Sequence, residues 1–274
     1  MLNVKLLVIV VTYNSQKFID WALAPLFDRE LCHVRVVDSG SSDVTYLSKL
    51  EKHNNVEIIF EKNLGFAKAN NRALYDIDNF DFVLFLNPDA RIESNELDEL
   101  LKRANSHENQ STGVFSVGLE KYSIDENRPL AFYDSLGIKC DAIGRWKDIQ
   151  GPCSIANKID IKYEAICGAF MLCKSTALKA LPDSRGNIGF EESFYMYKED
   201  IELSLRLGKK WGIKVFTDLK AYHCRGWGGA RDSNPYWARK HSAENDVYLA
   251  IHYKLRALPY AILKYLYVML LEKK

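Results

Sequence analysis

KLLVIVVTYN, residues 5–14, is an apolar and β-branched run that ends abruptly in three polar residues. A run of this kind is typical of a central strand in a parallel sheet, which is buried on both faces. Residues 5–11 therefore predict a buried strand. Ligands of such sheets bind beyond the carboxyl ends of the strands, so we expect Thr12, Tyr13 and Asn14 to line a binding site.

The same pattern repeats through the first half of the chain. The predicted strands are 5–11, 33–38, 56–60, 82–86 and 113–118, and the predicted helices run from Asn14 or Ser15 to 27, from the 39–42 turn to about 53, and over 66–76 and 95–105. Strands that alternate with helices indicate βαβ units. We expect an α/β, Rossmann-like fold with a mostly parallel central sheet flanked by helices. Polar clusters follow four of these strands, at 12–14, 38–42, 63–65 and 87–89.

The second half of the sequence is less regular. Residues 119–163 resemble loops and short strands, with turn signals at Pro129, Gly137, Gly144 and Gly151. Beyond them we predict strands at 165–173 and 213–217, a short helix from Ser175 to Leu181, and an amphipathic helix from Glu199 to Lys210. The expected organisation is one domain over 1–232, followed by a helical C-terminal segment over 233–274.

The C-terminal segment is rich in aromatic and basic residues. An apolar helix edged with Lys, Arg and Tyr is typical of a helix that lies on a membrane surface. The alternative is a helix that packs on the domain or on the partner subunit of a homodimer, and both interpretations stay open. No stretch of about 18 apolar residues is present, so the sequence does not predict a membrane span.

Composition narrows the function class. The chain has 274 residues, 47% of them hydrophobic, and a formal net charge of +1, so nothing indicates a nucleic-acid partner. Six cysteines occur without a CxxC pair, which predicts reduced thiols in a cytoplasmic protein. A Cys167–Cys173 disulfide is an open alternative.

Two aspartates follow predicted strands. Asp89 comes directly after the 82–86 strand, behind Asn87 and Pro88, where a carboxylate can hold Mg²⁺ or Mn²⁺ together with substrate phosphates. The alternative for Asp89 is a helix cap. Asp38 can accept a hydrogen bond from a nucleobase or a ribose, or it can bond to its own turn.

Three further sites lie in the second half. Glu199 and Asp200 open a predicted helix, where acidic residues complement the helix dipole; Asp200 is also a candidate general base. His223 is a candidate metal ligand or phosphate contact, with a structural role as the alternative. The Gly-rich loop 225–231 can close over phosphates or be an exposed loop. The candidate phosphate or acceptor contacts are Arg225, Trp227 and Arg231 of this loop, together with Glu199.

The ordered set of motifs resembles the family 2 glycosyltransferases, and among them the bacterial rhamnosyltransferase-like members. The resemblance covers about residues 6–225 and rests on VIVVTYN (8–14), VVDSGSSD (36–43), NLGFAKANNRAL (63–74), LFLNPDARI (84–92), ICGAFMLCK (166–174), FYMYKEDIELSLRL (194–207) and His223. Each motif is weak alone, whereas their order and spacing together are specific. The resemblance implies a GT-A fold.

The resemblance also implies roles for the matching residues. Base and ribose contacts fall on Thr12, Tyr13, Asn14 and Asp38, and further nucleotide contacts fall on Gly65, Phe66 and Asn71. Asn87-Pro88-Asp89 occupies the place of the DxD metal motif, with Asn in the first position. Asp200 matches the catalytic base, and His223 matches a histidine near the metal or the diphosphate.

The resemblance further implies an inverting transferase that uses a dTDP- or UDP-sugar, with rhamnose from dTDP-rhamnose as the leading expectation. The expected acceptor is a glycan or lipid-linked glycan such as an O-antigen precursor, reached from the cytoplasmic face of the inner membrane. A sugar nucleotidyltransferase is disfavoured by the Thr-Tyr-Asn-Ser loop, and a dehydrogenase by the lack of G-x-G-x-x-G after the first strand. A non-catalytic binding protein is the remaining alternative.

Overall fold

The structure is a computed structural model that describes residues 3–155, 161–225 and 235–272. The strands are β1 (Leu6–Thr12), β2 (Cys32–Ser39), β3 (Val56–Glu61), β4 (Phe82–Leu86), β5 (Ala90–Arg91), β6 (Thr112–Ser123), β7 (Arg128–Ser135), β8 (Ile138–Cys140), β9 (Trp146–Asp148), β10 (Gly151–Pro152), β11 (Phe170–Lys174) and β12 (Gly212–His223). The α-helices are α1 (Ile19–Leu23), α2 (Phe66–Arg72), α3 (Ser94–Ala104), α4 (Ser175–Ala180), α5 (Glu199–Leu207), α6 (Tyr236–His252) and α7 (Leu258–Leu271). This mixed α/β architecture confirms the predicted fold class.

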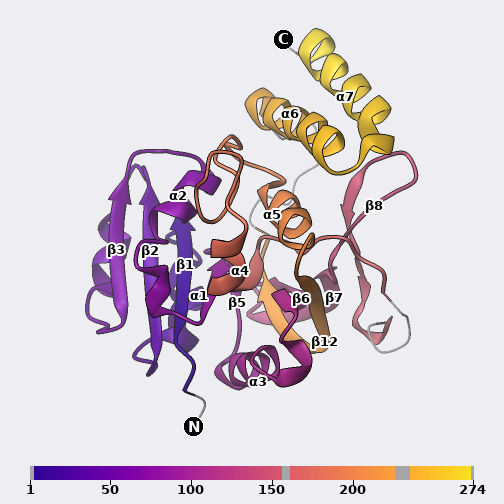
Figure 1. Ribbon diagram of the computed structural model, residues 1–274. Helices are drawn as coiled ribbons and strands as arrows, with labels where there is room; N and C mark the ends of the chain where they lie inside the picture. Colours follow the sequence, from indigo (N-terminus) through magenta and orange to yellow (C-terminus); the bar gives the residue numbers. More distant parts are fainter. Residues whose placement is uncertain (1–2, 156–160, 226–234, 273–274) are drawn as a thin grey trace.

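One sheet organises the molecule (Figure 1). The strands β3, β2, β1 and β4 are parallel neighbours, and β11 lies antiparallel between β4 and β6. The long strand β6 also pairs with β12 in parallel and with β7 antiparallel. The short strand β5 pairs with the end of β12. The parallel part of the sheet therefore brings the carboxyl ends of β1, β2, β3 and β4 to one edge.

The opening strand joins two cores. All seven residues of β1 are buried. Successive side chains of a strand point to opposite faces, so Leu6, Val8 and Val10 enter one hydrophobic cluster and the residues between them enter the other. Helices and loops must cover both faces, which is why the run contains no polar residue before Thr12.

The structure corrects several predicted boundaries. The first helix ends at Leu23 instead of 27 because Pro25, which lacks a backbone N–H, starts a 3-10 turn. The helix predicted to about 53 is a 3-10 helix over Thr45–Leu50. The strand predicted from 165 begins at Phe170, and all six cysteines, Cys167 and Cys173 included, are free thiols.

The second half contains more strand than the sequence predicts. β7 is an eight-residue strand in the region assigned to loops and short strands. β12 continues past the predicted end at 217 as far as His223, with alternate residues Leu219, Ala221 and His223 buried. Both strands pair with β6, and such long-range pairing leaves little trace in local sequence.

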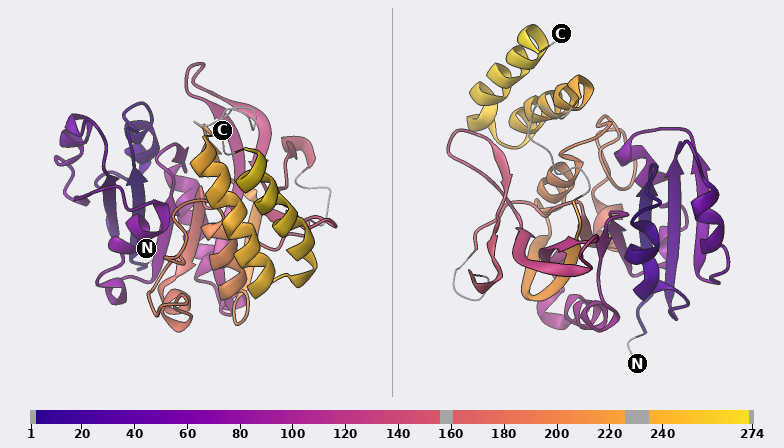
Figure 2. Two further views of the ribbon diagram at one scale, coloured as in Figure 1. Left: turned by 90° about the horizontal axis from the view of Figure 1, so that it is seen from above. Right: turned by 180° about the vertical axis from the view of Figure 1, so that it is seen from behind.

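The C-terminal helices form an antiparallel pair at the end of the molecule opposite α3 (Figures 1 and 2). α6 and the two residues that follow it pack on the domain: Tyr248 donates to Glu191, Tyr253 donates to Glu202, and Lys254 pairs with Glu164. α7 packs on α6 through Ala261 and Val268, which are buried. The predicted boundary at 232/233 lies outside the described residues. No described helix is long and apolar enough to cross a membrane.

A buried ion pair anchors the helix α5. Arg206 donates three hydrogen bonds to the Glu202 carboxylate one turn earlier and two more to the carbonyls of Leu181 and Gly189. The two charged side chains are 8% and 1% exposed. The pair therefore links α5 to the 181–189 loop.

We predict that Arg206→Leu lowers the free energy of unfolding by about 3–5 kcal/mol, because it leaves the Glu202 carboxylate buried without its cation. The exposed pair between Lys102 and Glu99 provides the control, since Lys102→Leu should change stability by less than about 1 kcal/mol. Urea titration of both variants measures the two effects. Equal stability losses would contradict this account of Arg206.

Candidate active site

The predicted nucleotide-binding residues of the first two strands meet at one edge of the sheet. Thr12, the last residue of β1, pairs with Asp38 near the end of β2. The Thr12 hydroxyl donates to the Asp38 carboxylate at 3.2 Å. Asp38 is 2% exposed and also accepts the backbone N–H groups of Gly40 and Ser41. Its carboxylate thus organises its own turn, which is the alternative that the sequence left open for Asp38.

The loop after β1 is fixed to the same turn. Asn14 has a left-handed backbone (φ 51°), and its side-chain oxygen accepts the backbone N–H and the hydroxyl of Ser42. Tyr13, in contrast, is 52% exposed. A rigid loop that presents an exposed ring beside a strand end offers a surface on which a flat nucleobase can stack.

Gly65 ends the connection from β3 to α2, as the N-cap of the helix. Its φ is 81°, and a Cβ atom at this position would collide with the carbonyl of Tyr195. That carbonyl accepts the N–H of Phe66 at 2.8 Å, and the Tyr195 hydroxyl donates to Asn63. Glycine is therefore required here for close approach of the 194–198 segment.

Phe66 and Asn71 have internal partners. The Phe66 ring lies 5.8 Å from the ring of Phe190 in the core. Asn71 forms two hydrogen bonds of 2.8 Å with the backbone of Phe190, one as donor and one as acceptor. Asn71 thereby holds the 183–193 loop against α2, a role that sequence reasoning missed because its partner lies far along the chain.

The predicted metal motif and His223 are neighbours. Asn87 follows β4, and the pairing of Ala90 with His223 sets Asp89 beside the histidine. His223 Nε2 lies 3.4 Å from Asp89 Oδ1, and Nδ1 lies 2.8 Å from Asp134 Oδ2. Burial alone would lower the pKa of His223, but the two carboxylates outweigh it and raise the pKa to about 9.

Two carboxylates of this cluster were missed in the sequence. Asp134, on β7, is fully buried and also faces Arg225 Nε at 3.3 Å. Asp148, on β9, accepts a 2.8 Å hydrogen bond from the same guanidinium. Burial would raise the pKa of Asp134, but His223 and Arg225 lower it overall. Nothing local marks these two residues, because they lie in the region that matched no motif.

Glu199 and Asp200 form the first turn of α5. Asp200 Oδ2 accepts the N–H of Gly168 at 2.8 Å, and Oδ1 accepts the N–H of Ile201. Burial raises the pKa of both carboxyls. The Gly168 hydrogen bond favours the ionised form of Asp200, and the charge of Asp148 opposes it. Asp200 therefore belongs to the same electrostatic cluster as Asp148 and Arg225.

The donors after β4 suit a hard divalent cation. Asn87 Oδ1 is buried and has no hydrogen-bond partner among the described residues, and Asp89 supplies a carboxylate close by. Mg²⁺ often takes one or two protein oxygens and completes its shell with water and phosphates. No group of three or more His, Cys, Asp or Glu within the described ranges could hold a metal by itself. His223 stays a candidate contact for the metal or for the diphosphate, and a metal-ligating imidazole would have to be neutral.

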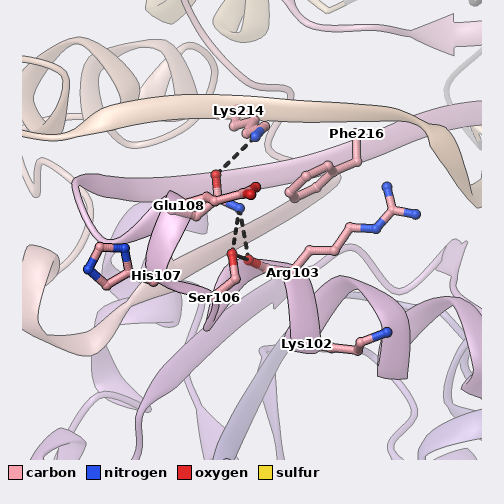
Figure 3. A pocket seen from close by; sticks show the side chains of 8 residues that line it. Lys102, Arg103, Ser106, His107, Glu108, Lys214 and Phe216 are labelled. Carbon is pink, nitrogen blue, oxygen red and sulfur yellow. Dashed lines mark hydrogen bonds between the residues drawn. The ribbon is translucent and has the colours of Figure 1, made fainter.

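A separate hollow lies at the other end of the sheet (Figure 3). It has a volume of about 680 Å³ and is lined by the end of α3 and by Lys214 and Phe216 near the start of β12. From Lys214 to His223, β12 spans roughly 30 Å. The hollow is therefore distinct from the candidate site. Two of the predicted phosphate contacts, Trp227 and Arg231, lie outside the described residues.

A family model described as Glycosyl transferase family 2 matches residues 7–175. The chain belongs to glycosyl transferase family 2. The match includes every strand-end cluster described above for the first half of the sheet. Asp200 and His223 lie beyond it, so their assignment to the site of this family 2 member rests on the geometry.

The family 2 member is also similar to individual proteins. The N-acetylglucosaminyl-diphospho-decaprenol L-rhamnosyltransferase of Mycobacterium tuberculosis is 24% identical over 264 residues, which cover 86% of this chain and 81% of the relative. TarS 1–349 of S. aureus is 20% identical with a TM-score of 0.54, over 96% of this chain and 71% of that one. The mannosyltransferase PcManGT of Pyrobaculum calidifontis, in complex with GDP-Man and Mn²⁺, is 16% identical with a TM-score of 0.60, over 98% and 70%. These structures confirm the GT-A fold.

We predict that Asp134→Asn lowers the pKa of His223 from about 9, because the variant loses the nearer carboxylate. In the wild type the folded-state pKa lies above the ordinary value of 6.5. Protonation of His223 therefore stabilises the fold fully below pH 6.5, and this stabilisation is lost as the pH rises toward 9.

NMR titration of the imidazole measures this shift, with His223→Gln to assign the resonance. Asp141→Asn is the control, since Asp141 bonds to Arg145 in the β8–β9 hairpin. An unchanged His223 pKa in Asp134→Asn would show that Asp134 does not set the charge of the histidine.

Proposed function

We propose that this family 2 member transfers a sugar from a nucleotide-sugar donor to a hydroxyl group of a glycan, with inversion at the anomeric carbon. The observation that carries the proposal is the position of Asp200. Its partly buried carboxylate is held by Gly168 and belongs to one charge cluster with Asp148, Arg225 and His223.

The proposed reaction is a single in-line displacement. The acceptor oxygen attacks the anomeric carbon of the donor and forms the new glycosidic bond, while the bond from that carbon to the diphosphate oxygen breaks. The acceptor hydroxyl proton passes to Asp200, and the nucleoside diphosphate leaves with the electron pair. Attack from the face opposite the leaving group inverts the configuration.

Two features support Asp200 as the base. Burial raises the pKa of its carboxyl above the ordinary value for aspartate, which brings it closer to the pH at which a general base works best. The Gly168 N–H fixes one carboxylate oxygen at 2.8 Å, so the side chain is oriented before the acceptor binds. Glu199 lies alongside, and its buried Oε2 lacks a hydrogen-bond partner in the described part of the chain.

Cations of the chain complement the leaving group. The protonated His223 and Arg225 lie where the charge of a departing diphosphate can be offset, held there by Asp134 and Asp148. Asn87 and Asp89 would hold Mg²⁺ or Mn²⁺, and the ion when bound would neutralise part of the diphosphate charge. Tyr13, Thr12 and Asn14 would receive the nucleotide at the ends of β1 and β2.

We propose dTDP-rhamnose as the donor and a lipid-linked glycan as the acceptor, as in an O-antigen or similar surface polysaccharide precursor. The support is the similarity to the mycobacterial rhamnosyltransferase, whose name specifies a diphospho-decaprenol acceptor. A UDP-sugar is the alternative donor, because TarS has been solved with UDP and with UDP-GlcNAc.

The outer face of α7 supports a proposal that the protein binds a membrane surface. Two adjacent rows of side chains on this face, each at i, i+4 spacing, are exposed and contain no charged residue. The rows consist of Ile262, Leu263, Leu266, Tyr267, Leu270 and Leu271. The charged residue within α7, Lys264, points inward to Asp246. An exposed apolar stripe of this size is unusual for a monomer in water. We propose that α7 lies on the cytoplasmic face of the inner membrane, where a lipid-linked acceptor would be found.

We predict that Asp200→Asn lowers kcat for transfer by about 10²–10⁴-fold, because asparagine cannot accept the hydroxyl proton. The variant should fold, since its side-chain oxygen can still accept the Gly168 N–H. The assay measures transfer of the sugar from dTDP-rhamnose and from UDP-sugars, once with Mg²⁺ or Mn²⁺ and once with a chelator. Asp98→Asn on α3 is the control variant. Wild-type activity in Asp200→Asn would remove the proposed base.

We predict that Leu263→Ser combined with Leu270→Ser abolishes sedimentation with anionic lipid vesicles. These two side chains are 68% and 73% exposed, so the substitution should leave the melting temperature unchanged. The control is Leu31→Ser, at an exposed leucine directly before β2. If the wild-type chain does not sediment with vesicles but dimerises through α7, the result would contradict the membrane proposal and favour a homodimer.

A further inference from the structure

The turn that precedes the carboxylate pair has an unusual backbone. Tyr197 and Lys198 are consecutive, neither is glycine, and both have left-handed φ values, 73° and 67°. Left-handed backbone is unfavourable for residues with a Cβ atom, and two in succession persist only where the surroundings hold them. Lys198 is also the N-cap of α5, so its conformation sets the direction in which Glu199 and Asp200 start the helix.

One side chain of α6 binds this turn directly. Asn245 Nδ2 donates hydrogen bonds to the carbonyl oxygens of Met196 at 3.0 Å and of Tyr197 at 2.7 Å. An asparagine amide has two donor hydrogens, and both are used here. Asn245 is 6% exposed, so neither carbonyl is solvated by bulk water at the contact.

A second contact holds the lysine of the turn. Lys198 pairs with Asp246, which is 3% exposed and also accepts a 2.7 Å hydrogen bond from Lys264 of α7. Burial is the largest influence on the pKa of Lys198 and lowers it to about 8, although Asp246 opposes this shift. The turn is therefore tied to α6 at three successive residues, Met196 to Lys198.

The opposite side of the same segment touches the nucleotide end of the sheet. The Tyr195 carbonyl accepts the N–H of Phe66, and its hydroxyl donates to Asn63. The segment is thus fixed from two sides, by the turn that contains Gly65 and by α6. A shift of α6 relative to the domain would move the start of α5.

We propose that Asn245 is a positioning residue that holds the Met196–Lys198 turn and so orients the Asp200 carboxylate toward the acceptor. This inference rests on the proposed function of Asp200. Asn245 touches no reacting atom. It acts through the backbone, and the Lys198–Asp246 pair is a second anchor for the same turn.

The test is Asn245→Ala in the full chain. Loss of both donors should lower kcat by about 10–100-fold, since misplacement of a catalytic group by an ångström has effects of this size. KM for the donor should stay unchanged, because the proposed base and ribose contacts Thr12, Tyr13 and Asn14 lie at the end of β1 and make no hydrogen bond to the turn. Lys240→Ala is the matched control on the same helix, where the Lys240–Glu244 pair is partly exposed and does not involve the turn.

Hydrogen exchange provides a readout that does not depend on transfer. In Asn245→Ala the amides of residues 195–201 should exchange faster, while those of β1 and β4 keep their wild-type rates. Unchanged exchange in 195–201, or a wild-type kcat in the folded variant, would overturn the inference. A wild-type chain without transferase activity would refute the proposed function alone, and the exchange data would still decide whether Asn245 holds the turn.

Discussion

Burial of β1 on both faces is the constraint on which the rest of the structure depends. A strand with seven buried residues in succession can exist only between two cores, and the alternating residues of β1 supply both. Polar side chains are excluded along the length of β1, and the first one is Thr12 at its end. The parallel register with β2 and β4 then collects the other strand ends at the same edge, and chemistry that needs polar side chains is confined there.

The first half of the fold was predictable because its signals are local. Each strand there is a short apolar run followed by a polar turn, although β4 pairs with β1 and β11 rather than with β3. Pro25 shows the limit of this reasoning, since the apolar period of the first helix continues beyond the point at which the proline ends it. The second half depends on partners of β6, and β7 could not be predicted from 128–135 alone.

The candidate site was predictable to the same extent. The sequence indicates Thr12, Asp38, Asn87, Asp89 and Asp200 as candidates, because short polar residues at strand ends and helix starts are visible in sequence. Asp134 and Asp148 were not, because a single aspartate in an unassigned region carries no pattern. Their contacts with His223 and Arg225 become visible only in the structure, where β7 and β9 bring these side chains together. Asp38 and Asn71 differ from these two aspartates. The sequence indicates them as ligand contacts, whereas in the structure both form hydrogen bonds within the protein.

Charge balance gives a reason for asparagine at position 87. Asp89, Asp134, Asp148 and Asp200 already bring four carboxylates to the site, against the cations His223 and Arg225. A further buried carboxylate would need its own cation, because ionised groups are costly to bury without a partner. An amide oxygen keeps a donor atom for a divalent ion without adding charge. In the proposed function, the histidine, whose pKa the carboxylate of Asp134 raises, would contribute positive charge beside the diphosphate, and a bound cation would share the remaining charge.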